Sequence, residues 1–245
     1  MSDTLMFRCI LTAALVAAVA VAGAYGQKGF KEDVFETSAG TLKVTFIGHG
    51  SLMFSLDGKV IHIDPTMMVY PEYASLPKAD LILVTHEHGD HFDAKAIEAI
   101  RTPGTKIVAN AAAAQSVPGA VVLNNGDAQT VAGVPVEAVA AYNPEKPFHP
   151  KGNGNGYILT FGNTRVYVAG DTEFIPEMRA IKSVDVAFLP MNQPYTMTPE
   201  QAADAAKAFR PKVVYPYHYQ FGDTDTAKFV DLLKDEKGIE VRIRY

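Results

Sequence analysis

ADLILVTHEHGDHFD, residues Ala79–Asp93, is the stretch that decides both the fold and the chemistry expected of this chain. Its apolar run, Leu81–Val84, is short enough to form one buried strand. Directly after Thr85 come four side chains with metal-binding atoms: His86, His88, Asp90 and His91. Imidazole nitrogen and carboxylate oxygen are atoms that bind Zn²⁺ and its neighbours in the first transition series. The pattern therefore predicts a metal centre at the end of a buried strand.

The spacing within this cluster predicts two ions. Residues i and i+2 of an extended segment point the same way, so His86 and His88 can hold one ion. Once the backbone turns, Asp90 and His91 can face a second. A lone histidine in an apolar segment is usually a core residue, and a chance polar loop is the alternative here. Three imidazoles and a carboxylate at one strand end are hard to explain by packing.

The cluster resembles the HxHxDH motif of the metallo-β-lactamase superfamily. The resemblance implies an α+β fold, a four-layer αββα sandwich with one or two metal ions along one edge of its sheets. It also implies hydrolysis of esters, lactones, thioesters, amides or phosphodiesters. The resemblance covers essentially the whole chain after the N-terminal segment, and the pattern of loops and helices looks most like the ascorbate-6-phosphate-lactonase-like branch.

Residues 1–26 have the composition of a signal peptide. Arg8 gives a weakly positive start, Ile10–Val21 is apolar, and Ala22-Gly23-Ala24 offers a small-residue cleavage site. The apolar run is shorter than the roughly 20 residues that span a bilayer. We expect cleavage near Ala24–Gln27 and a periplasmic or secreted protein. The alternative is an uncleaved N-terminal anchor, which would be the chain's contact with a membrane.

Residues 27–245 are expected to form one metallo-β-lactamase-like domain, because roughly 220 residues fit a single large domain. The one cysteine, Cys9, precedes the cleavage site, so the mature chain has no disulfide to form. The net charge is −5, and lysine and arginine are scattered. Nucleic-acid backbones are bound by clustered cations, so we expect a small-molecule substrate and no nucleic acid. The sequence does not specify an oligomeric state.

Alternating polar and apolar residues predict an antiparallel meander in the first half of the chain. Its strands are Thr41–Phe46, Leu52–Leu56 and Lys59–Asp64, and Asp57-Gly58 is a strong hairpin signal between the last two. The glycine-rich run at 152–156 lacks the Lys-Ser/Thr of a phosphate-binding loop and is expected to be a flexible loop. Further strands are expected at Lys106–Ala109, Val121–Leu123, Val134–Ala140, Arg165–Ala169, Val184–Leu189, Lys212–Tyr217 and Ile239–Ile243.

Three helices are predicted. The first covers Asp93–Ile100, with Asp93 able to cap its first turn. The second begins at Thr198, where Thr198 and Gln201 form the pattern of a capping box. The third covers Thr224–Lys237, with Gly238 just beyond its end.

Two residues far along the chain match further metal ligands of the superfamily. Asp171 follows Gly170 at the end of an expected strand and resembles the aspartate that bridges two ions. A carboxylate suits that role because each of its two oxygens has lone pairs to offer. His218, at the end of the expected strand Lys212–Tyr217, matches the last ligand of the second ion.

The third histidine of the first ion is less well defined. In the superfamily it comes from the region after the strand expected at Val134–Ala140. Here Asn143 follows that strand, and the nearest histidine is His149, which lies between Pro147 and Pro150. His149 is the candidate ligand. Asn143 is the alternative, as a weaker oxygen ligand or as a substrate contact.

Three other residues are candidates for contacts with the substrate or with the ligands. His49 lies in a Gly-flanked turn that allows close backbone approach, and the family has a comparable Gly-His turn. Asp64 resembles an aspartate that orients the ligand loop, with a plain Asp-Pro turn as the alternative. Tyr195 precedes the helix at Thr198; its phenol could donate to a substrate oxygen, or the residue could be a packed surface tyrosine.

Taken together, the resemblance implies a complete ligand set. His86, His88 and His149 would hold one ion, Asp90, His91 and His218 would hold the second, and Asp171 would bridge them. Two zinc ions are expected, with Mn²⁺ or Fe²⁺ as alternatives. Such a pair lowers the pKa of a shared water, and the metal-bound hydroxide attacks a carbonyl or phosphoryl centre. Asp90 is also the candidate catalytic residue, to orient the nucleophile or pass a proton.

Three functions stay open from the sequence. The favoured one is a metal-dependent hydrolase of a small lactone, ester or phosphodiester. A tRNA-processing type of nuclease is disfavoured by the acidic charge and the export signal. The third is a metal-binding protein without catalysis, or an iron-dependent oxidoreductase on the same fold. Hydrolysis of β-lactams is disfavoured, because the commonest zinc class uses a cysteine ligand and the mature chain would have none.

Overall fold

The structure, a computed structural model, describes residues 29–219 and 224–244. The expected signal segment and Cys9 lie outside these residues. None of the helices in the described ranges has the length and apolar composition of a transmembrane span.

The described strands form two seven-stranded sheets, each in sequence order. In the first sheet, β1 to β4 are antiparallel and β4 to β7 are parallel. Its strands are β1 (Lys31–Thr37), β2 (Gly40–Gly48), β3 (Ser51–Leu56), β4 (Lys59–Ile63), β5 (Leu81–Val84), β6 (Lys106–Ala109) and β7 (Val121–Val122). The expected meander and the Asp57-Gly58 hairpin are confirmed, with Leu56 paired to Lys59.

The second sheet repeats this plan. Strands β8 to β11 are antiparallel, and β11 to β14 are parallel. They are β8 (Ala128–Val131), β9 (Val134–Ala141), β10 (Gly154–Phe161), β11 (Thr164–Val168), β12 (Val186–Pro190), β13 (Val213–Tyr217) and β14 (Glu240–Val241).

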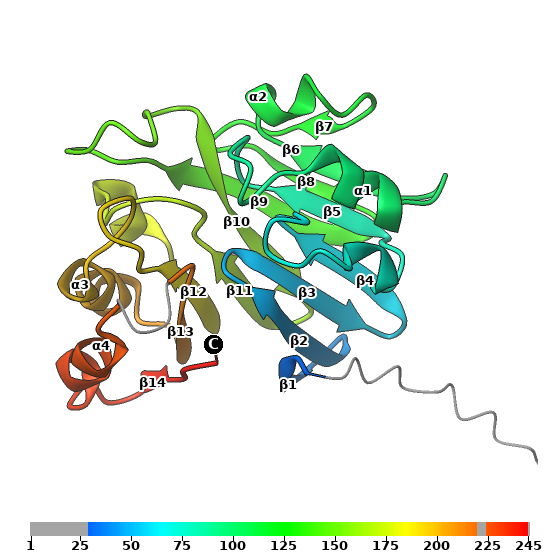
Figure 1. Cartoon of the computed structure of the whole chain (residues 1–245). Helices are drawn as coiled ribbons and strands as arrows, with labels where there is room; N and C mark the ends of the chain where they lie inside the picture. The colour runs from blue at the N-terminus through cyan, green and yellow to red at the C-terminus, as the bar shows by residue number, and fades with distance from the viewer. Residues whose placement is uncertain (1–28, 220–223, 245) are drawn as a thin grey trace, which may run out of the picture.

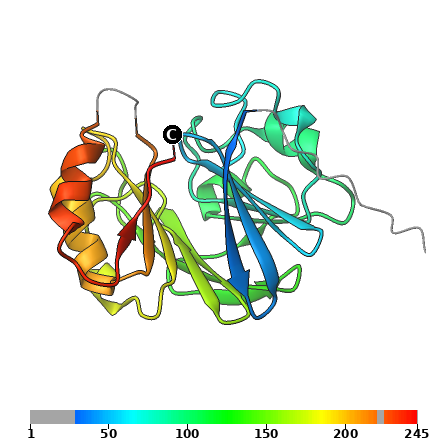
Figure 2. The ribbon, with the colours of Figure 1, turned by 90° about the horizontal axis from the view of Figure 1, so that it is seen from below.

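Helices cover the outer face of each sheet, which confirms the predicted αββα sandwich (Figure 1 and Figure 2). Helices α1 (Ala94–Ile100) and α2 (Ala111–Ala114) pack on the first sheet. Helices α3 (Pro199–Phe209) and α4 (Thr226–Leu233) pack on the second. The largest apolar cluster lies between the sheets.

This layering explains why the run Leu81–Val84 is apolar throughout. Leu81 and Leu83 belong to the core between the sheets, whereas Ile82 and Val84 face the helix layer. All four are fully buried, as expected of a parallel strand that is covered on both faces. Because both faces of this strand are covered, metal-binding side chains cannot be exposed from within it. They follow instead after its C-terminal end.

The expectation of a flexible loop at 152–156 is wrong for its second half, because Gly154 begins β10, a central strand paired with β9 and β11. The glycines are needed for packing: a Cβ on Gly156 would lie 2.8 Å from the Ala169 carbonyl oxygen. Between them, buried Asn155 donates to the Leu123 carbonyl oxygen at 2.7 Å. Glycine here marks close approach of neighbouring chain, which a local pattern cannot distinguish from a loop.

Helix ends agree with their signals in two cases and differ in the third. Asp93 accepts from the Lys95 N–H at the start of α1, and both bonds of the Thr198–Gln201 capping box are present. The last helix is shorter than expected. It covers Thr226–Leu233, with Asp225 as its N-cap, and Gly238 lies in the turn that follows (φ +86°).

The strand residue His62 makes the fold sensitive to acid. It is fully buried, and its ring contacts the Pro77 carbonyl oxygen at 3.0 Å and the Tyr73 hydroxyl at 3.4 Å. Burial lowers the pKa of His62 to about 4, although the bond to Pro77 opposes this. The unfolded chain takes up that proton near pH 6.5, so stability that is present above pH 6.5 is lost as the pH falls toward 4.

We therefore expect His62 to remove about 2 kcal/mol from the free energy of unfolding between pH 7 and pH 5. Urea unfolding of the chelator-treated chain at both pH values measures this loss. In His62→Gln, which cannot be protonated, the loss should be smaller by that amount. An equal loss in both proteins would show that His62 titrates normally.

Candidate metal centre

The predicted ligands gather in one place, where strands from both sheets end. His86 follows β5, Asp171 follows β11 and His218 follows β13. Neighbouring parallel strands end at the same edge of a sheet, and the two sheets face each other with these ends on the same side. Residues distant in sequence therefore share one pocket.

The first cluster consists of His86, His88 and His149, whose candidate donor atoms lie within 4.8 Å of one another. His86 Nε2 and His88 Nδ1 are 3.1 Å apart. The ring centroid of His149 lies 5.2 Å from that of His86 and 5.1 Å from that of His88. His86 and His149 are buried, whereas His88 is exposed, so the cluster opens to solvent on one side.

Asn143 and His149 occupy different positions relative to this cluster. Asn143 Oδ1 accepts a hydrogen bond from His149 Nδ1 at 2.6 Å, and both side chains are buried. The proton on Nδ1 leaves His149 Nε2 without one in the neutral ring, and Nε2 lies 3.2 Å from Asp171 Oδ2. The geometry thus favours His149 as the third nitrogen donor, with the Asn143 oxygen engaged in holding its ring.

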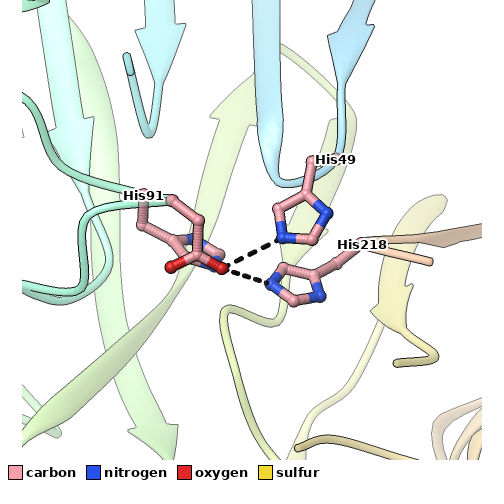
Figure 3. A group of neighbouring side chains, drawn as sticks. His49, His91 and His218 are labelled. Atoms are coloured by element: carbon pink, nitrogen blue, oxygen red, sulfur yellow. Dashed lines mark hydrogen bonds and ion pairs between the residues drawn. The ribbon is translucent and has the colours of Figure 1, made fainter. Parts of the chain in front are cut away.

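The second cluster consists of His49, Asp90, His91 and His218, whose candidate donor atoms also lie within 4.8 Å of one another. Asp90 Oδ2 is 3.0 Å from His49 Nε2 and 3.5 Å from His218 Nε2, the two contacts drawn as dashed lines in Figure 3. The ring centroids of His49 and His218 are 3.7 Å apart. The sequence predicted an outer or substrate contact for His49; the structure places it within this cluster.

Asp64 lies behind the second cluster and orients His91. It is fully buried and accepts from His91 Nδ1 at 2.7 Å. It also accepts from the backbone N–H and the hydroxyl of Thr85, both at 2.7 Å. The Thr85 hydroxyl lies 3.0 Å from His86 Nδ1, so one carboxylate is linked to a ring in each cluster. Thr85, which the sequence analysis did not single out, is the connection.

Asp171 lies between the two clusters. Its Oδ1 is 3.3 Å from Nε2 of both His91 and His218. Its Oδ2 is 3.2 Å from Nε2 of His149 and 3.8 Å from Nε2 of His86. One carboxylate oxygen therefore faces each cluster, which is the arrangement expected of a ligand shared by two ions.

Buried atoms without hydrogen bonds support metal binding at this place. Among the described residues, His91 Nε2, Asp171 Oδ1 and His218 Nε2 are buried and make no hydrogen bond. A buried polar atom without a partner is costly, and an ion is one of the groups that satisfy it. All three atoms converge on one point, and imidazole with carboxylate is a suitable donor set for a transition metal. The residues present fit a metal centre.

Carboxylates and imidazoles of the centre shift one another's pKa values. Burial lowers the pKa of His91, but the carboxylates of Asp171 and Asp64 outweigh it and raise that pKa well above its ordinary value. Burial raises the pKa of Asp171, but His218 and His91 hold it well below its usual range. Burial and the neighbouring His91 lower the pKa of His86. The carboxylates of Asp171 and Asp64 thus favour a positive charge at His91.

Backbone strain is concentrated in the same place. His49, Asp64 and His218 have φ of 50°, 48° and 51°, the left-handed region that residues with a Cβ seldom adopt. The His218 N–H donates to the His49 carbonyl oxygen at 2.9 Å, which joins two of these residues. Such strain persists where surrounding structure enforces it, often at functional sites.

Glycines allow the backbone to approach the ligands. A Cβ on Gly50 would lie 2.7 Å from the His91 ring, and one on Gly170 would lie 2.6 Å from the Asn155 carbonyl oxygen. A side chain at Gly50 would displace the His91 ring, and one at Gly170 would displace β10. The close approach predicted for the Gly-flanked turn around His49 is therefore present in the structure, at Gly50.

A cavity of about 360 Å³ opens over both clusters. Tyr195 is 45% exposed at its rim, and its ring packs edge-on against Phe148 with centroids 4.8 Å apart. Phe148 and Asn192 were not predicted as site residues. Phe148 directly precedes the predicted ligand His149, and Asn192 lies three residues before Tyr195. The cavity is lined by His88, Asp90, Phe148, His149, Asp171, Asn192, Tyr195 and His218.

Comparison with known proteins agrees with this geometry. Residues 43–218 match the β-lactamase superfamily domain. A UPF0173 metal-dependent hydrolase of Thermococcus kodakarensis is 36% identical over 191 residues, covering 73% of this chain and 84% of the relative. Among solved structures, a proposed metal-dependent hydrolase from Parabacteroides distasonis is 52% identical, with a TM-score of 0.83, over 88% of this chain and 98% of its own.

A second solved structure is more distant. The metallo hydrolase Igni18 of Ignicoccus hospitalis is 28% identical, with a TM-score of 0.70, over 82% of this chain and 94% of its own. In both solved structures nearly the whole of the relative is matched. The chain belongs to the metallo-β-lactamase superfamily and, within it, to the UPF0173 family of metal-dependent hydrolases.

Proposed function

We propose that this metal-dependent hydrolase holds two zinc ions and cleaves a small, uncharged carboxylic ester or lactone. The observation that carries the proposal is the position of Asp171, with one oxygen toward each histidine cluster. Histidine nitrogen predominates among the donors, which favours zinc over magnesium or calcium. Mn²⁺ and Fe²⁺ accept similar donors and are the alternatives.

Each cluster would hold one ion. His86, His88 and His149 would bind the first, and Asp90, His91 and His218 would bind the second, with Asp171 shared. When bound, the ions lower the pKa of water toward neutrality and stabilise negative charge on oxygen. The protein itself holds the ligands, orients water and accommodates the substrate.

Asp90 is suited to orient the attacking water. Its side chain lines the cavity and is 35% exposed. Burial raises the pKa of Asp90, but the neighbouring His218 and His49 rings outweigh it and hold the pKa below its ordinary value. The carboxylate is therefore ionised at neutral pH and can accept a hydrogen bond from water. The 3.0 Å contact from His49 holds its orientation.

The lining of the cavity favours an uncharged substrate. No lysine or arginine is among the described residues that line it. Nearby Lys146 is engaged elsewhere, since its Nζ donates to the Thr196 carbonyl oxygen at 2.7 Å and pairs with Glu173 at 3.3 Å. A phosphorylated substrate, such as the resemblance to ascorbate-6-phosphate lactonases suggests, would find no free cation among these side chains. Phe148 and Tyr195 instead offer an aromatic wall, and the Tyr195 hydroxyl is a candidate donor to a substrate oxygen.

A substrate panel tests the proposal. The full chain, stripped with chelator and reloaded with Zn²⁺, is assayed on a γ-lactone, p-nitrophenyl acetate, a thioester and bis-p-nitrophenyl phosphate. We expect turnover of the lactone and the acetate, loss with chelator and recovery with Zn²⁺. Preference for the phosphodiester would overturn the substrate class. Recovery with Fe²⁺ alone would overturn the metal, and full occupancy without turnover would indicate a non-catalytic metal-binding protein.

We also propose that the chain acts in the periplasm or outside the cell. The support is the composition of residues 1–26, with an apolar run followed by Ala22-Gly23-Ala24. N-terminal sequencing of protein recovered from the periplasmic fraction or the medium should begin near Ala24–Gln27. Full-length protein in the membrane fraction would instead indicate an uncleaved anchor.

A further inference from the structure

One histidine of each cluster, His91 in the second and His149 in the first, is supported by a chemically different group. His91 donates from Nδ1 to the carboxylate of Asp64 at 2.7 Å. His149 donates from Nδ1 to the neutral amide of Asn143 at 2.6 Å. A carboxylate behind a ring makes it a more basic metal ligand than an amide does, because the carboxylate's charge stabilises positive charge on the ring.

The two clusters also differ in negative charge, and the second cluster again has more of it. The second cluster contains the carboxylate of Asp90, with Asp64 behind it. The first cluster consists of three imidazoles and contains no carboxylate of its own. Asp171 presents one oxygen to each and does not distinguish them. A divalent ion is therefore attracted more strongly to the second cluster.

The surroundings of Asn143 explain why an amide and not a carboxylate lies behind His149. Its Nδ2 donates to the Tyr195 carbonyl oxygen at 3.1 Å, while its backbone N–H donates to the His149 carbonyl oxygen at 2.8 Å. An aspartate would place its second oxygen against the Tyr195 carbonyl. Asn143 thus joins the loop that carries His149 to the loop that carries Tyr195, and both loops line the cavity.

We propose that the two ions bind with unequal affinity, tightly at Asp90, His91 and His218 and weakly at His86, His88 and His149, and that Asn143 is the positioning residue that sets the weaker affinity. The inference rests on the two-ion centre proposed above. At low metal concentration the protein then carries one ion. The centre is complete only when the histidine-only cluster has also bound its ion.

Calorimetric titration of Zn²⁺ into the chelator-treated full chain tests the unequal affinities. We expect two steps, the second at least about tenfold weaker than the first. His88→Ala should abolish the weak step and keep the tight one, and His218→Ala should do the reverse. Loss of the tight step in His88→Ala would overturn the assignment. A single step of two ions per chain would overturn the unequal affinities alone, whereas a single step of one ion per chain would overturn the two-ion centre itself, and with it the proposed function.

Variants of Asn143 test its role separately. Asn143→Ala should weaken the weak step by about 10- to 100-fold and leave the tight step unchanged. Asn143→Asp keeps an acceptor for His149, so it should bind the weak ion at least as tightly as Asn143 does, despite losing its bond to Tyr195. Asn192→Ala, which removes another amide of the cavity lining, is the matched control and should leave both steps unchanged.

Two outcomes would overturn the role of Asn143 without touching the proposed function. One is a weak step that Asn143→Ala leaves unmoved. The other is an Asn143→Asp variant as weak as Asn143→Ala, which would show that loop packing and not the hydrogen bond to His149 matters. Melting curves of the metal-free variants, expected to coincide with wild type within a few degrees, show that each has folded.

Discussion

Asp171→Asn should remove both ions and lower the rate of hydrolysis by about 10³-fold or more, because a two-ion centre supplies several kcal/mol of transition-state stabilisation. The physical reason is the position of Asp171 between the clusters, with Oδ1 at 3.3 Å from His91 and Oδ2 at 3.2 Å from His149. An amide retains the volume but brings an NH₂ group toward nitrogen donors on one side. Metal content by atomic emission and the steady-state rate are measured on the same preparation.

The matched control is Asp93→Asn, a change of the same kind close to the metal-binding motif. Asp93 caps α1, where asparagine is an equally good cap, and it lies outside both clusters. Metal content and rate should stay at wild-type values. An Asp171→Asn protein that kept two ions and full activity would contradict the shared-ligand assignment.

Asp64→Ala should lower the free energy of unfolding by about 3 kcal/mol and weaken metal binding by about 10- to 100-fold. Asp64 is fully buried and accepts three hydrogen bonds, from His91 and from the N–H and hydroxyl of Thr85. Removing the carboxylate leaves the Thr85 N–H buried without its acceptor and frees the His91 ring to rotate. Urea unfolding of the metal-free chain measures the first effect, and zinc titration measures the second.

Asp80→Ala is the comparison for this variant. Asp80 precedes β5 at the end opposite the metal centre, and its carboxylate accepts from the Val60 N–H at 2.8 Å. We expect a loss of less than about 1 kcal/mol and unchanged zinc affinity. Equal metal affinity in Asp64→Ala and wild type would show that His91 needs no support from Asp64.

Local patterns predicted most of the elements because the forces behind them act over a few residues. The buried strand Leu81–Val84, the Asp57-Gly58 hairpin and the Thr198 capping box were each read from adjacent side chains and are present. Strands β1, β8 and β10 were not predicted. In β1 the apolar alternation is interrupted by charged residues at exposed positions. In β10 the glycines resemble those of a loop.

Within the metal centre, the sequence left two questions that contacts between distant segments answer in geometric terms. Asn143 and His149 were alternative donors, and the 2.6 Å hydrogen bond between them shows that one holds the other. His49 was an outer or substrate contact, and its left-handed backbone brings Nε2 to 3.0 Å from Asp90.

The sequence by itself determined the chemistry of the donors and the ends of the strands that carry them, because hydrophobic periodicity and turn chemistry are local; the layered fold was implied by the resemblance to the superfamily. Only the tertiary structure decided which atoms face one another: the two oxygens of Asp171 toward opposite clusters, Asp64 behind His91 and Asn143 behind His149. The packing of one sheet against the other sets these distances, and no pattern within a single segment encodes that packing.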